Sequence, residues 1–313
     1  MSQILVQAPG MLTTVQDLGR EGHGPMGVSA SGAADSIALR LGNRLVGNAD
    51  GTAALEMTLL GGTFIFPQGA AVAITGSDFA ATLDGIPVGL WAAVKVSPGQ
   101  KLSLGHTRSG ARCYLCVQGG ISVEPFLGSA STHVLSGLGG FEGRPLRKGD
   151  VLSVGPGAGP FRKRKLAQWA REALAPRKLL RVTPGPQADW FPESSQQLFH
   201  KSSYRVAEES NRMGLRLEGQ PIAAGSSGEM ITEGVSLGAI QVPEGGLPII
   251  LFVEQQTTGG YPKIANVITA DLPSVGQLRP RDEIRFESVG WEAARQLLGE
   301  QAELLASKEL ILG

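Results

Sequence analysis

The sequence has little cysteine, few aromatic residues and no excess of charge of either sign. Its 28 basic and 28 acidic residues cancel at pH 7, which argues against a dedicated nucleic-acid binder and against attraction to an anionic membrane. No apolar run reaches the roughly 18 residues that a membrane-spanning helix needs. The N-terminus lacks the basic segment and apolar segment of a secretory signal. We therefore expect a soluble, cytoplasmic protein.

The two cysteines, Cys113 and Cys116, form a CxxC pattern, which elsewhere indicates a redox or metal site. Residues 111–118 are rich in Tyr, Leu and Val and predict a β-strand. Residues three apart on a strand point to opposite faces, so we expect the two sulfur atoms to diverge. The four histidines show no ligand spacing, and the sequence predicts no metal site.

Glycine is abundant, with 44 residues beside 19 prolines, together about a fifth of the chain. A glycine inside a helix costs about 1 kcal/mol relative to alanine, whereas turns and bulges favour it. Short apolar runs separated by Gly- and Pro-containing turns fill residues 53–155 and 179–289, which is typical of β-barrels and sandwiches. One amphipathic helix is predicted within residues 31–47, with Ser31 or Asp35 as its N-cap. The expected fold is mainly β with a few short helices.

The length of 313 residues and a weak internal repeat predict two related β domains. Residues 60–69 and 237–245 share an apolar residue, a glycine, a strand and a Pro-x-Gly turn. Between the halves, a basic run with a short helical pattern is interpreted as a solvated linker rather than a phosphate site. The predicted division is a β domain over 1–160, a basic helical linker over 161–178, and a β domain with a closing helix over 179–313.

The densest group of unusual polar residues is the segment Gln255-Gln-Thr-Thr-Gly-Gly-Tyr-Pro262, which follows an apolar strand predicted at 248–253. Its amides and hydroxyls offer neutral donors and acceptors. Gly259 and Gly260 allow close backbone approach to a ligand and can form an anion nest, and Tyr261 adds a stacking surface. A plain hairpin turn needs none of these, so a ligand-binding loop is favoured. The segment does not match a Walker loop.

Three other segments are candidates for binding. Asp17 and Arg20 either hold a polar substrate or form a structural ion pair. Arg212 lies beside a glycine and resembles a planar clamp for carboxylate or phosphate. Residues 128–132 form a small-residue loop with hydroxyl groups. No Ser-His-Asp set and no nucleophile elbow is found.

Five segments closely resemble the biotin-dependent carboxyltransferase family, in family order: 13–20, 128–132, 211–217, 238–243 and 256–262. The resemblance extends over nearly the whole chain and implies cyclophilin-like β-barrels, two of them related here. One departure is Arg281, which stands where the family usually has the glycine of a Pro-Gly-Asp turn.

The family includes allophanate-hydrolase subunit 2 and the C subunit of prokaryotic ATP-dependent 5-oxoprolinase, and this chain is most similar to the latter branch. The resemblance implies conversion of 5-oxo-L-proline to L-glutamate with ATP hydrolysis, beside a directly contacting B-type subunit and an A-type subunit. ATP with Mg²⁺ would be shared with, or bound by, the B-type partner. No Met-Lys-Met biotinyl motif is present, so no biotin is expected on this chain. The alternatives are a carboxyltransferase subunit of a urea carboxylase or allophanate hydrolase system, and a non-catalytic regulatory partner of the B-type subunit.

The resemblance and the local patterns together suggest a set of site residues. The predicted catalytic residues are Arg212, Gln256 and Thr257. We expect Arg212→Ala and Thr257→Ala to abolish activity with little change in the melting temperature. The predicted substrate-binding residues are Asp17, Arg20, Ser31, Ser131, Thr132, Thr258, Gly259, Gly260 and Tyr261.

Overall fold

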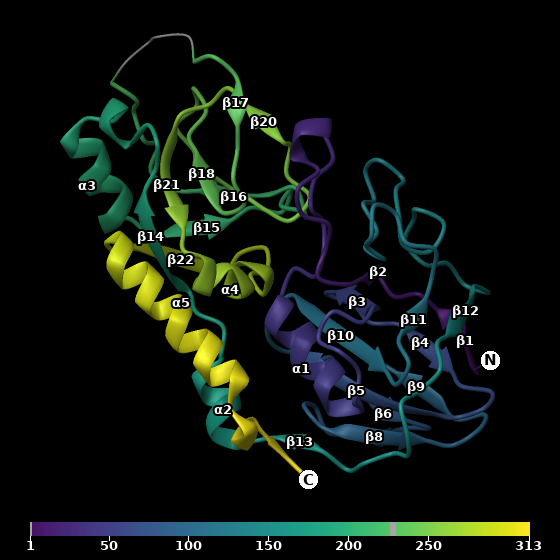
Figure 1. The fold of residues 1–313 in the computed structure, drawn as a ribbon. Helices are drawn as coiled ribbons and strands as arrows, with labels where there is room; N and C mark the ends of the chain where they lie inside the picture. Colours follow the sequence, from purple (N-terminus) through teal and green to yellow (C-terminus); the bar gives the residue numbers. More distant parts are fainter. Residues whose placement is uncertain (1, 226–229) are drawn as a thin grey trace. The chain divides into compact units, whose positions relative to one another are not determined.

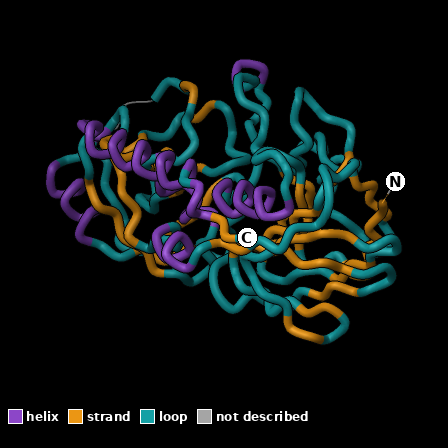
Figure 2. Tube along the Cα trace, turned by 60° about the horizontal axis from the view of Figure 1, so that its bottom comes forward, coloured by secondary structure: helices purple, strands orange, loops and turns teal. Residues whose placement is uncertain are grey.

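The computed structural model describes residues 2–225 and 230–313, and the chain divides into two compact units (Figure 1). Strands and loops make up most of the chain and helices are few, so the expected mainly β class is confirmed (Figure 2). Unit 1 comprises Met1–Arg20, Ser31–Leu174 and Ser307–Gly313, and unit 2 comprises Glu21–Ala30 and Ala175–Ala306.

The unit boundaries differ from the division predicted from the sequence. The expected linker 161–178 is not a separate segment, because β13 (Lys165–Leu166) and α2 (Gln168–Ala173) belong to unit 1. The short strand β13 pairs antiparallel with β23 (Ile311–Leu312), which brings the C-terminal residues into the same unit. Residues Glu21–Ala30 cluster instead with unit 2. These exchanges depend on pairing between distant segments, which local patterns do not encode.

Unit 1 contains two antiparallel sheets. The strands of the first are β1 (Ser2–Ala8), β4 (Thr63–Ile65), β6 (Thr82–Leu83), β7 (Ile86–Pro87), β9 (Lys101–Ser103), β11 (Ile121–Ser122) and β12 (Val151–Val154). Those of the second are β2 (Leu12–Gln16), β3 (Ala54–Thr58), β5 (Ala70–Gly76), β8 (Ala93–Val96) and β10 (Arg112–Val117). The strand orders are β11-β12-β1-β4-β9-β6-β7 and β2-β3-β10-β5-β8.

The strand β10 is buried on both faces and separates two parts of the core. Cys113 belongs to the larger apolar cluster of unit 1, whereas Cys116 packs with the helix α1 (Ser36–Val46). The expectation that the two sulfur atoms diverge is confirmed. Burial raises the pKa of both thiols, so they stay protonated at neutral pH. At Gly42 a Cβ would lie 2.6 Å from Cys116 Sγ, which explains a glycine inside this helix.

The ends of α1 follow the predicted capping pattern. Asp35 is the N-cap, and its side chain accepts a hydrogen bond from the Ala38 N–H at 2.9 Å. Gly47 is the C-cap with a left-handed φ of 81°, which only glycine adopts without strain. Ser31, the other candidate cap, lies outside the helix at a φ of 55°.

Unit 2 is built around a closed barrel. Its strands are β14 (Leu179–Pro184), β15 (Tyr204–Val206), β16 (Gly214–Glu218), β18 (Ala239–Gln241), β19 (Ile249–Leu251), β21 (Lys263–Val267) and β22 (Glu283–Ser288). They close in the order β14-β21-β18-β19-β16-β15-β22, in which only the β14–β22 pair is parallel. A separate two-stranded sheet joins β17 (Glu233–Gly234) to β20 (Thr258–Gly259).

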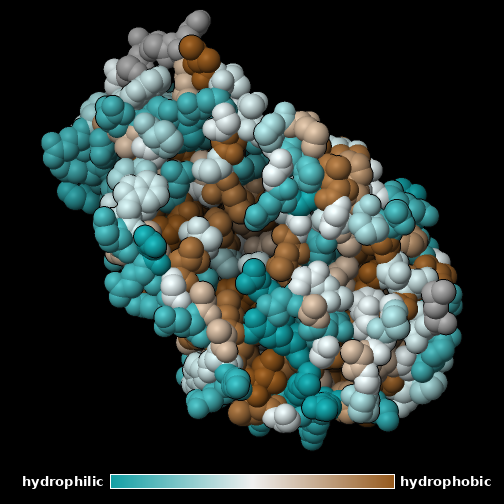
Figure 3. Space-filling model, viewed as in Figure 1, coloured by the Kyte–Doolittle hydropathy of each residue, from teal (hydrophilic) through white to brown (hydrophobic). Residues whose placement is uncertain are grey.

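Three helices of unit 2 are α3 (Glu193–Lys201), α4 (Leu272–Gly276) and α5 (Trp291–Ala306), the last being the predicted closing helix. The ring of Phe199 from α3 stacks on Phe286 of β22 with centroids 4.6 Å apart, which anchors this helix to the barrel. No helix in the described part of the chain is long and apolar enough to cross a bilayer. Hydrophilic and hydrophobic residues are interspersed over the face drawn in Figure 3.

The turn before β22 carries the family departure noted in the sequence. Arg281 has a φ of 71°, in the left-handed region where a side chain is strained and glycine is not. We expect Arg281→Gly to raise the free energy of unfolding by about 1 kcal/mol, because the strain is relieved. Loss of the exposed ion pair between Arg281 and Glu208 should make this gain smaller. Urea unfolding of the two proteins measures this difference. A lower stability for the glycine variant would contradict the strain.

Candidate functional site

The segment that the sequence singles out forms an accessible loop of unit 2. It begins after β19 and runs through β20 to the start of β21. The side chains of Gln256 and Thr258 are exposed, Thr257 is half-buried, and Tyr261 is 46% exposed. Of the groups predicted to bind a ligand, the Gln256 amide, the Thr258 hydroxyl and the Tyr261 ring are therefore open to solvent, whereas Gly259 is buried.

The two glycines of this loop have a different role from the one predicted. An anion nest needs a left-handed residue beside a right-handed one, but neither Gly259 nor Gly260 has a positive φ, and Gly259 lies in β20. The predicted nest is wrong. Gly259 instead leaves room for two glutamine amides, because a Cβ there would lie 2.5 Å from Gln241 Nε2 and 3.0 Å from Gln256 Nε2.

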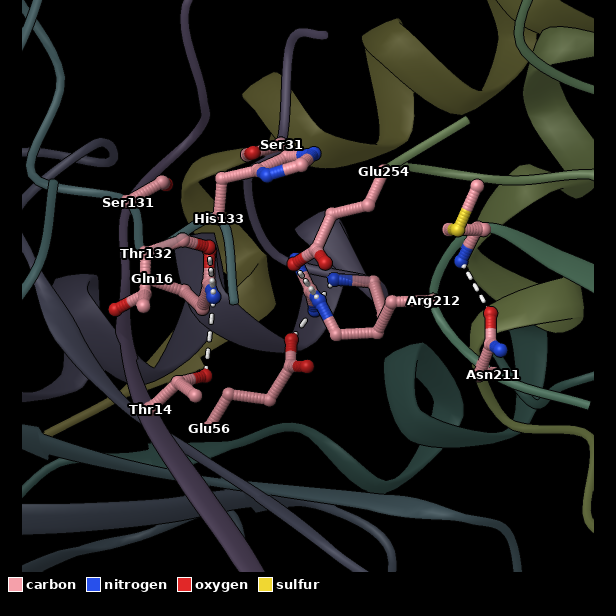
Figure 4. Close-up of polar contacts among 12 residues, drawn as sticks. Thr14, Gln16, Ser31, Glu56, Ser131, Thr132, His133, Asn211, Arg212 and Glu254 are labelled. Atoms are coloured by element: carbon pink, nitrogen blue, oxygen red, sulfur yellow. Dashed lines mark hydrogen bonds and ion pairs between the residues drawn. The ribbon is translucent and has the colours of Figure 1, made fainter. Parts of the chain in front are cut away.

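A buried ion pair holds the residue just before the loop. Arg212 Nε lies 2.5 Å from Glu254 Oε1, and the two side chains are 5% and 4% exposed (Figure 4). The Glu254 N–H also donates to the Arg212 carbonyl at 2.9 Å. The turn that carries Arg212 is fixed by Asn211 Oδ1, which accepts from the Met213 N–H at 2.8 Å. Arg212 thus fixes the start of the loop through both its main chain and its side chain.

A second ionic group beside the loop escaped the sequence analysis. Lys263 at the start of β21 is buried, and its Nζ lies 2.6 Å from Glu233 Oε1. Gln187 Nε2 donates to the same oxygen at 3.0 Å. These two donors, Lys263 first, hold the pKa of Glu233 below its usual value. The sequence feature that could have indicated this buried lysine is its position directly before the apolar residues of β21.

The predicted site residues of unit 1 are bonded to one another. The Asp17 carboxylate accepts four hydrogen bonds, from the Gly19 N–H at 2.7 Å, Ser129 Oγ at 2.6 Å, the Ala130 N–H at 2.7 Å and Ser131 Oγ at 2.6 Å. This carboxylate therefore ties the 128–132 loop to the end of β2.

Arg20 and Thr132 extend the same network. Arg20 donates through Nη1 to Ser31 Oγ at 3.3 Å and through Nη2 to the Ser131 carbonyl. Thr132 Oγ1 donates to the Val15 carbonyl at 3.0 Å, and Gln16 Nε2 donates to the Thr132 carbonyl at 3.0 Å (Figure 4). The structure thus brings Asp17, Arg20, Ser31, Ser131 and Thr132 together inside unit 1.

This network makes Asp17 a strong determinant of stability. We expect Asp17→Asn to lower the free energy of unfolding of unit 1 by about 3 kcal/mol. The asparagine side chain has an NH2 group in place of one carboxylate oxygen, and this group would face an N–H or O–H donor that loses its acceptor. Urea unfolding measures the loss, with Glu124→Gln on an exposed neighbouring position as the control. Equal stability of the two variants would contradict the role of the carboxylate.

A buried carboxylate at the base of α1 was also missed. Glu56 Oε2 accepts from Tyr114 Oη at 2.7 Å and from the Ala34 N–H at 2.9 Å. Tyr114 Oη in turn accepts from the Asp35 N–H at 2.8 Å. Burial, with the neighbouring Glu56 charge, raises the pKa of Tyr114. Arg112 Nε lies 3.6 Å from Glu56 Oε1 and supplies positive charge.

Across residues 2–225 and 230–313, no group of three or more His, Cys, Asp or Glu residues is arranged to hold a metal ion. The chemistry that unit 2 offers is instead hydrogen bonding by exposed amides and hydroxyls, beside the buried Arg212–Glu254 pair and the half-exposed Lys263–Glu233 pair.

Comparison with known proteins defines the family. The model of the carboxyltransferase domain, subdomain A and B, matches residues 26–288. The chain belongs to this carboxyltransferase-domain family. Four of the five segments that carry the resemblance lie inside the match, including the 256–262 loop.

Members of the carboxyltransferase-domain family include both free-standing subunits and parts of large enzymes. The chain is 40% identical to the C subunit of the Escherichia coli 5-oxoprolinase over 285 residues, which cover 91% of each protein. It is 37% identical to the urea amidolyase of Saccharomyces cerevisiae over 94% of this chain but 17% of that protein. The crystal structure of the K. lactis urea amidolyase matches 99% of this chain with a TM-score of 0.90 at 34% identity, and the chain spans 21% of its length.

Proposed function

We propose that this chain is the C subunit of an ATP-dependent 5-oxoprolinase, acting with A- and B-type subunits to convert 5-oxo-L-proline to L-glutamate. The observation that carries the proposal is 40% identity to the C subunit of the E. coli 5-oxoprolinase over 91% of both proteins. That relative is matched over nearly its whole length, whereas the urea amidolyases are several times longer. We place the complex in the cytoplasm, where ATP is available.

The chemistry requires activation of a poor electrophile. A lactam carbon reacts slowly with water because its nitrogen donates electron density to the carbonyl. Transfer of a phosphoryl group from ATP to the lactam oxygen releases ADP and makes the ring carbon more electrophilic. Addition of water to that carbon, cleavage of the ring C–N bond and hydrolysis of the resulting acyl phosphate then give glutamate and phosphate. The B- and C-type subunits together perform this activation in our proposal, and the ring is then opened by the A-type partner.

The residues of this chain would act mainly by hydrogen bonding. Gln256 and Thr257 present donors to the charge that develops on the lactam oxygen, and Thr258, Gly259, Gly260 and Tyr261 complete the contact surface. Arg212 acts on this loop through Glu254, which it holds at 2.5 Å. The unit 1 residues Asp17, Arg20, Ser31, Ser131 and Thr132 position the 128–132 loop for substrate.

ATP with Mg²⁺ is assigned mainly to the B-type partner. A phosphate cradle uses successive backbone N–H groups in a nest or a Walker loop. Neither Gly259 nor Gly260 has the positive φ that a nest needs, and the sequence contains no Walker ending. The loop of this chain thus fits the amide substrate better than the triphosphate.

The direct test measures ATP-dependent release of glutamate from 5-oxo-L-proline by purified A- and B-type subunits, with and without this chain. We expect activity only when all three are present. Full activity without this chain would overturn the proposal. A reaction with no ATP and one with heat-denatured chain serve as controls.

The second candidate is carboxyl transfer from carboxybiotin to urea or a related amide. The fold match to the K. lactis urea amidolyase at a TM-score of 0.90 favours it. The same loop would then hold the ureido ring of a biotin carried by another protein. Incubation with carboxybiotin and urea, followed for loss of the carboxyl group, separates this reaction from ATP-dependent ring opening.

A further inference from the structure

A charged side chain lies buried in the barrel of unit 2. Lys263 is 2% exposed, and an ammonium at such a position requires a nearby counter-charge or loses its proton. Glu233 provides this charge, with its Oε1 2.6 Å from Lys263 Nζ. Gln187 Nε2 adds a hydrogen bond to the same oxygen. One oxygen of the Glu233 carboxylate is therefore contacted by two donors, an ammonium and an amide.

The two sides of this contact are held very differently. Lys263 is part of the closed barrel, and its main-chain N–H and carbonyl both bond to Gln187, at 3.2 Å and 3.3 Å. Glu233 lies on the two-residue strand β17, is 44% exposed, and pairs with Gly259 of the equally short β20. Lys263 is thus held by the barrel and Gln187 by its bonds to Lys263, whereas the carboxylate comes from a two-residue strand outside the barrel.

A further donor lies next to the pair and has no acceptor. Gln241 faces Lys263 across the β18–β21 ladder and is 2% exposed. Its Nε2 has no hydrogen-bond partner among the residues that the structure describes. The same nitrogen lies 2.5 Å from the position that a Cβ of Gly259 would occupy, and Gly259 is the residue paired with Glu233. A buried amide with no acceptor costs free energy that a ligand oxygen would recover.

We propose that Lys263, Gln187 and Gln241 form a carboxylate-binding site, which Glu233 fills until a small-molecule carboxylate replaces it. The exchange swaps one ion pair for another, so the ammonium is never buried alone. On the proposed function this ligand is the carboxylate of 5-oxo-L-proline, whose lactam then lies beside Gln256 and Thr257. That assignment of the ligand rests on the proposed function, whereas the site itself does not.

The experiment removes the internal carboxylate and supplies an external one. Glu233→Ala should lower the melting temperature, and sodium acetate should raise it again by about 3 °C or more. Acetamide with sodium chloride at the same ionic strength should have no such effect. The matched control is Glu208→Ala, which removes an exposed carboxylate of unit 2 from its pair with Arg281. In that variant and in the unaltered chain, acetate and acetamide should have the same effect on the melting temperature.

A second variant shows whether the ammonium is responsible. Adding Lys263→Met to Glu233→Ala should abolish the response to acetate, and the double variant avoids an unpaired buried charge. An acetate response that survives in the double variant would overturn the site. So would equal responses in Glu233→Ala, Glu208→Ala and the unaltered chain.

The substrate assignment is tested with 5-oxo-L-proline and 5-oxo-L-prolinamide, which lacks the carboxylate. Stabilisation of Glu233→Ala by the acid and not by the amide supports the whole proposal. If acetate acts and 5-oxo-L-proline does not, the site stands and the proposed substrate fails. If the three-subunit mixture releases glutamate but Glu233→Ala ignores acetate, the proposed function stands and the site fails.

Discussion

Replacing Thr257 with alanine is expected to lower ATP-dependent glutamate release by the three-subunit mixture by about 100-fold or more, as loss of one preorganised donor does in other enzymes. The melting temperature should not change. The side chain of Thr257 is half-buried, and the Thr257 carbonyl, which accepts from the Val235 N–H at 3.1 Å, is kept in the variant. The loop should therefore retain its shape while it loses one hydroxyl.

The matched control is Thr269→Ala, at an exposed position of unit 2 outside the loop. It should retain full activity. Gln256→Ala should resemble Thr257→Ala, because the Gln256 side chain is exposed on the same loop. Activity of Thr257→Ala within about threefold of the unaltered chain would show that this hydroxyl contributes no donor to the reaction.

The largest expected loss of stability follows from Arg212→Ala. The variant leaves the Glu254 carboxylate buried at 4% exposure without its nearest cation, and breaking such a pair costs about 3–5 kcal/mol. The free energy of unfolding from urea denaturation measures this loss. The sequence alone predicted an effect on activity with no effect on melting, and the burial of the pair changes that expectation.

Arg205→Ala is the appropriate comparison, because Arg205 forms an exposed pair with Glu283 in the same unit at 3.7 Å. An exposed pair contributes about 0–1 kcal/mol, so this variant should remain close to the unaltered chain. Equal losses for Arg205→Ala and Arg212→Ala would mean that the buried pair contributes no more than a surface one. Glutamate release by Arg212→Ala should also fall, since Glu254 directly precedes the 255–262 loop, which we propose binds the substrate.

Local patterns predicted α1, α5 and the β character of the chain, but not α3 and α4, which lie in the region 179–289 predicted as β-strands. Apolar residues at every fourth position, an Asp35 cap and a Gly47 stop define α1, and each of these features depends on residues close in sequence. The alternation of β10 likewise separates Cys113 from Cys116. The position of the 255–262 loop also follows from sequence, because its polar residues directly succeed a strand.

Pairing between distant residues had no such signal. Glu233 and Lys263 are 30 positions apart, and Glu56 and Tyr114 are 58 positions apart, so only the register of the sheets brings their side chains together. Lys263 could be recognised as a charge near an apolar strand, but nothing local identifies its partner. The anion nest failed for a related reason, because strand pairing with β17 fixes Gly259 in an extended conformation.

The sequence by itself determined the β class, the helices α1 and α5, the position of the polar 255–262 loop and the family, because composition, periodicity and motifs are properties of neighbouring residues. The tertiary structure decided which polar groups are buried and with what they pair. It closed the barrel of unit 2, joined the C-terminal residues to unit 1 through β13 and β23, and buried the side chains of Arg212 and Lys263 next to their carboxylates. Burial and pairing are set by contacts across the whole fold, and these contacts turn a polar loop into a candidate site.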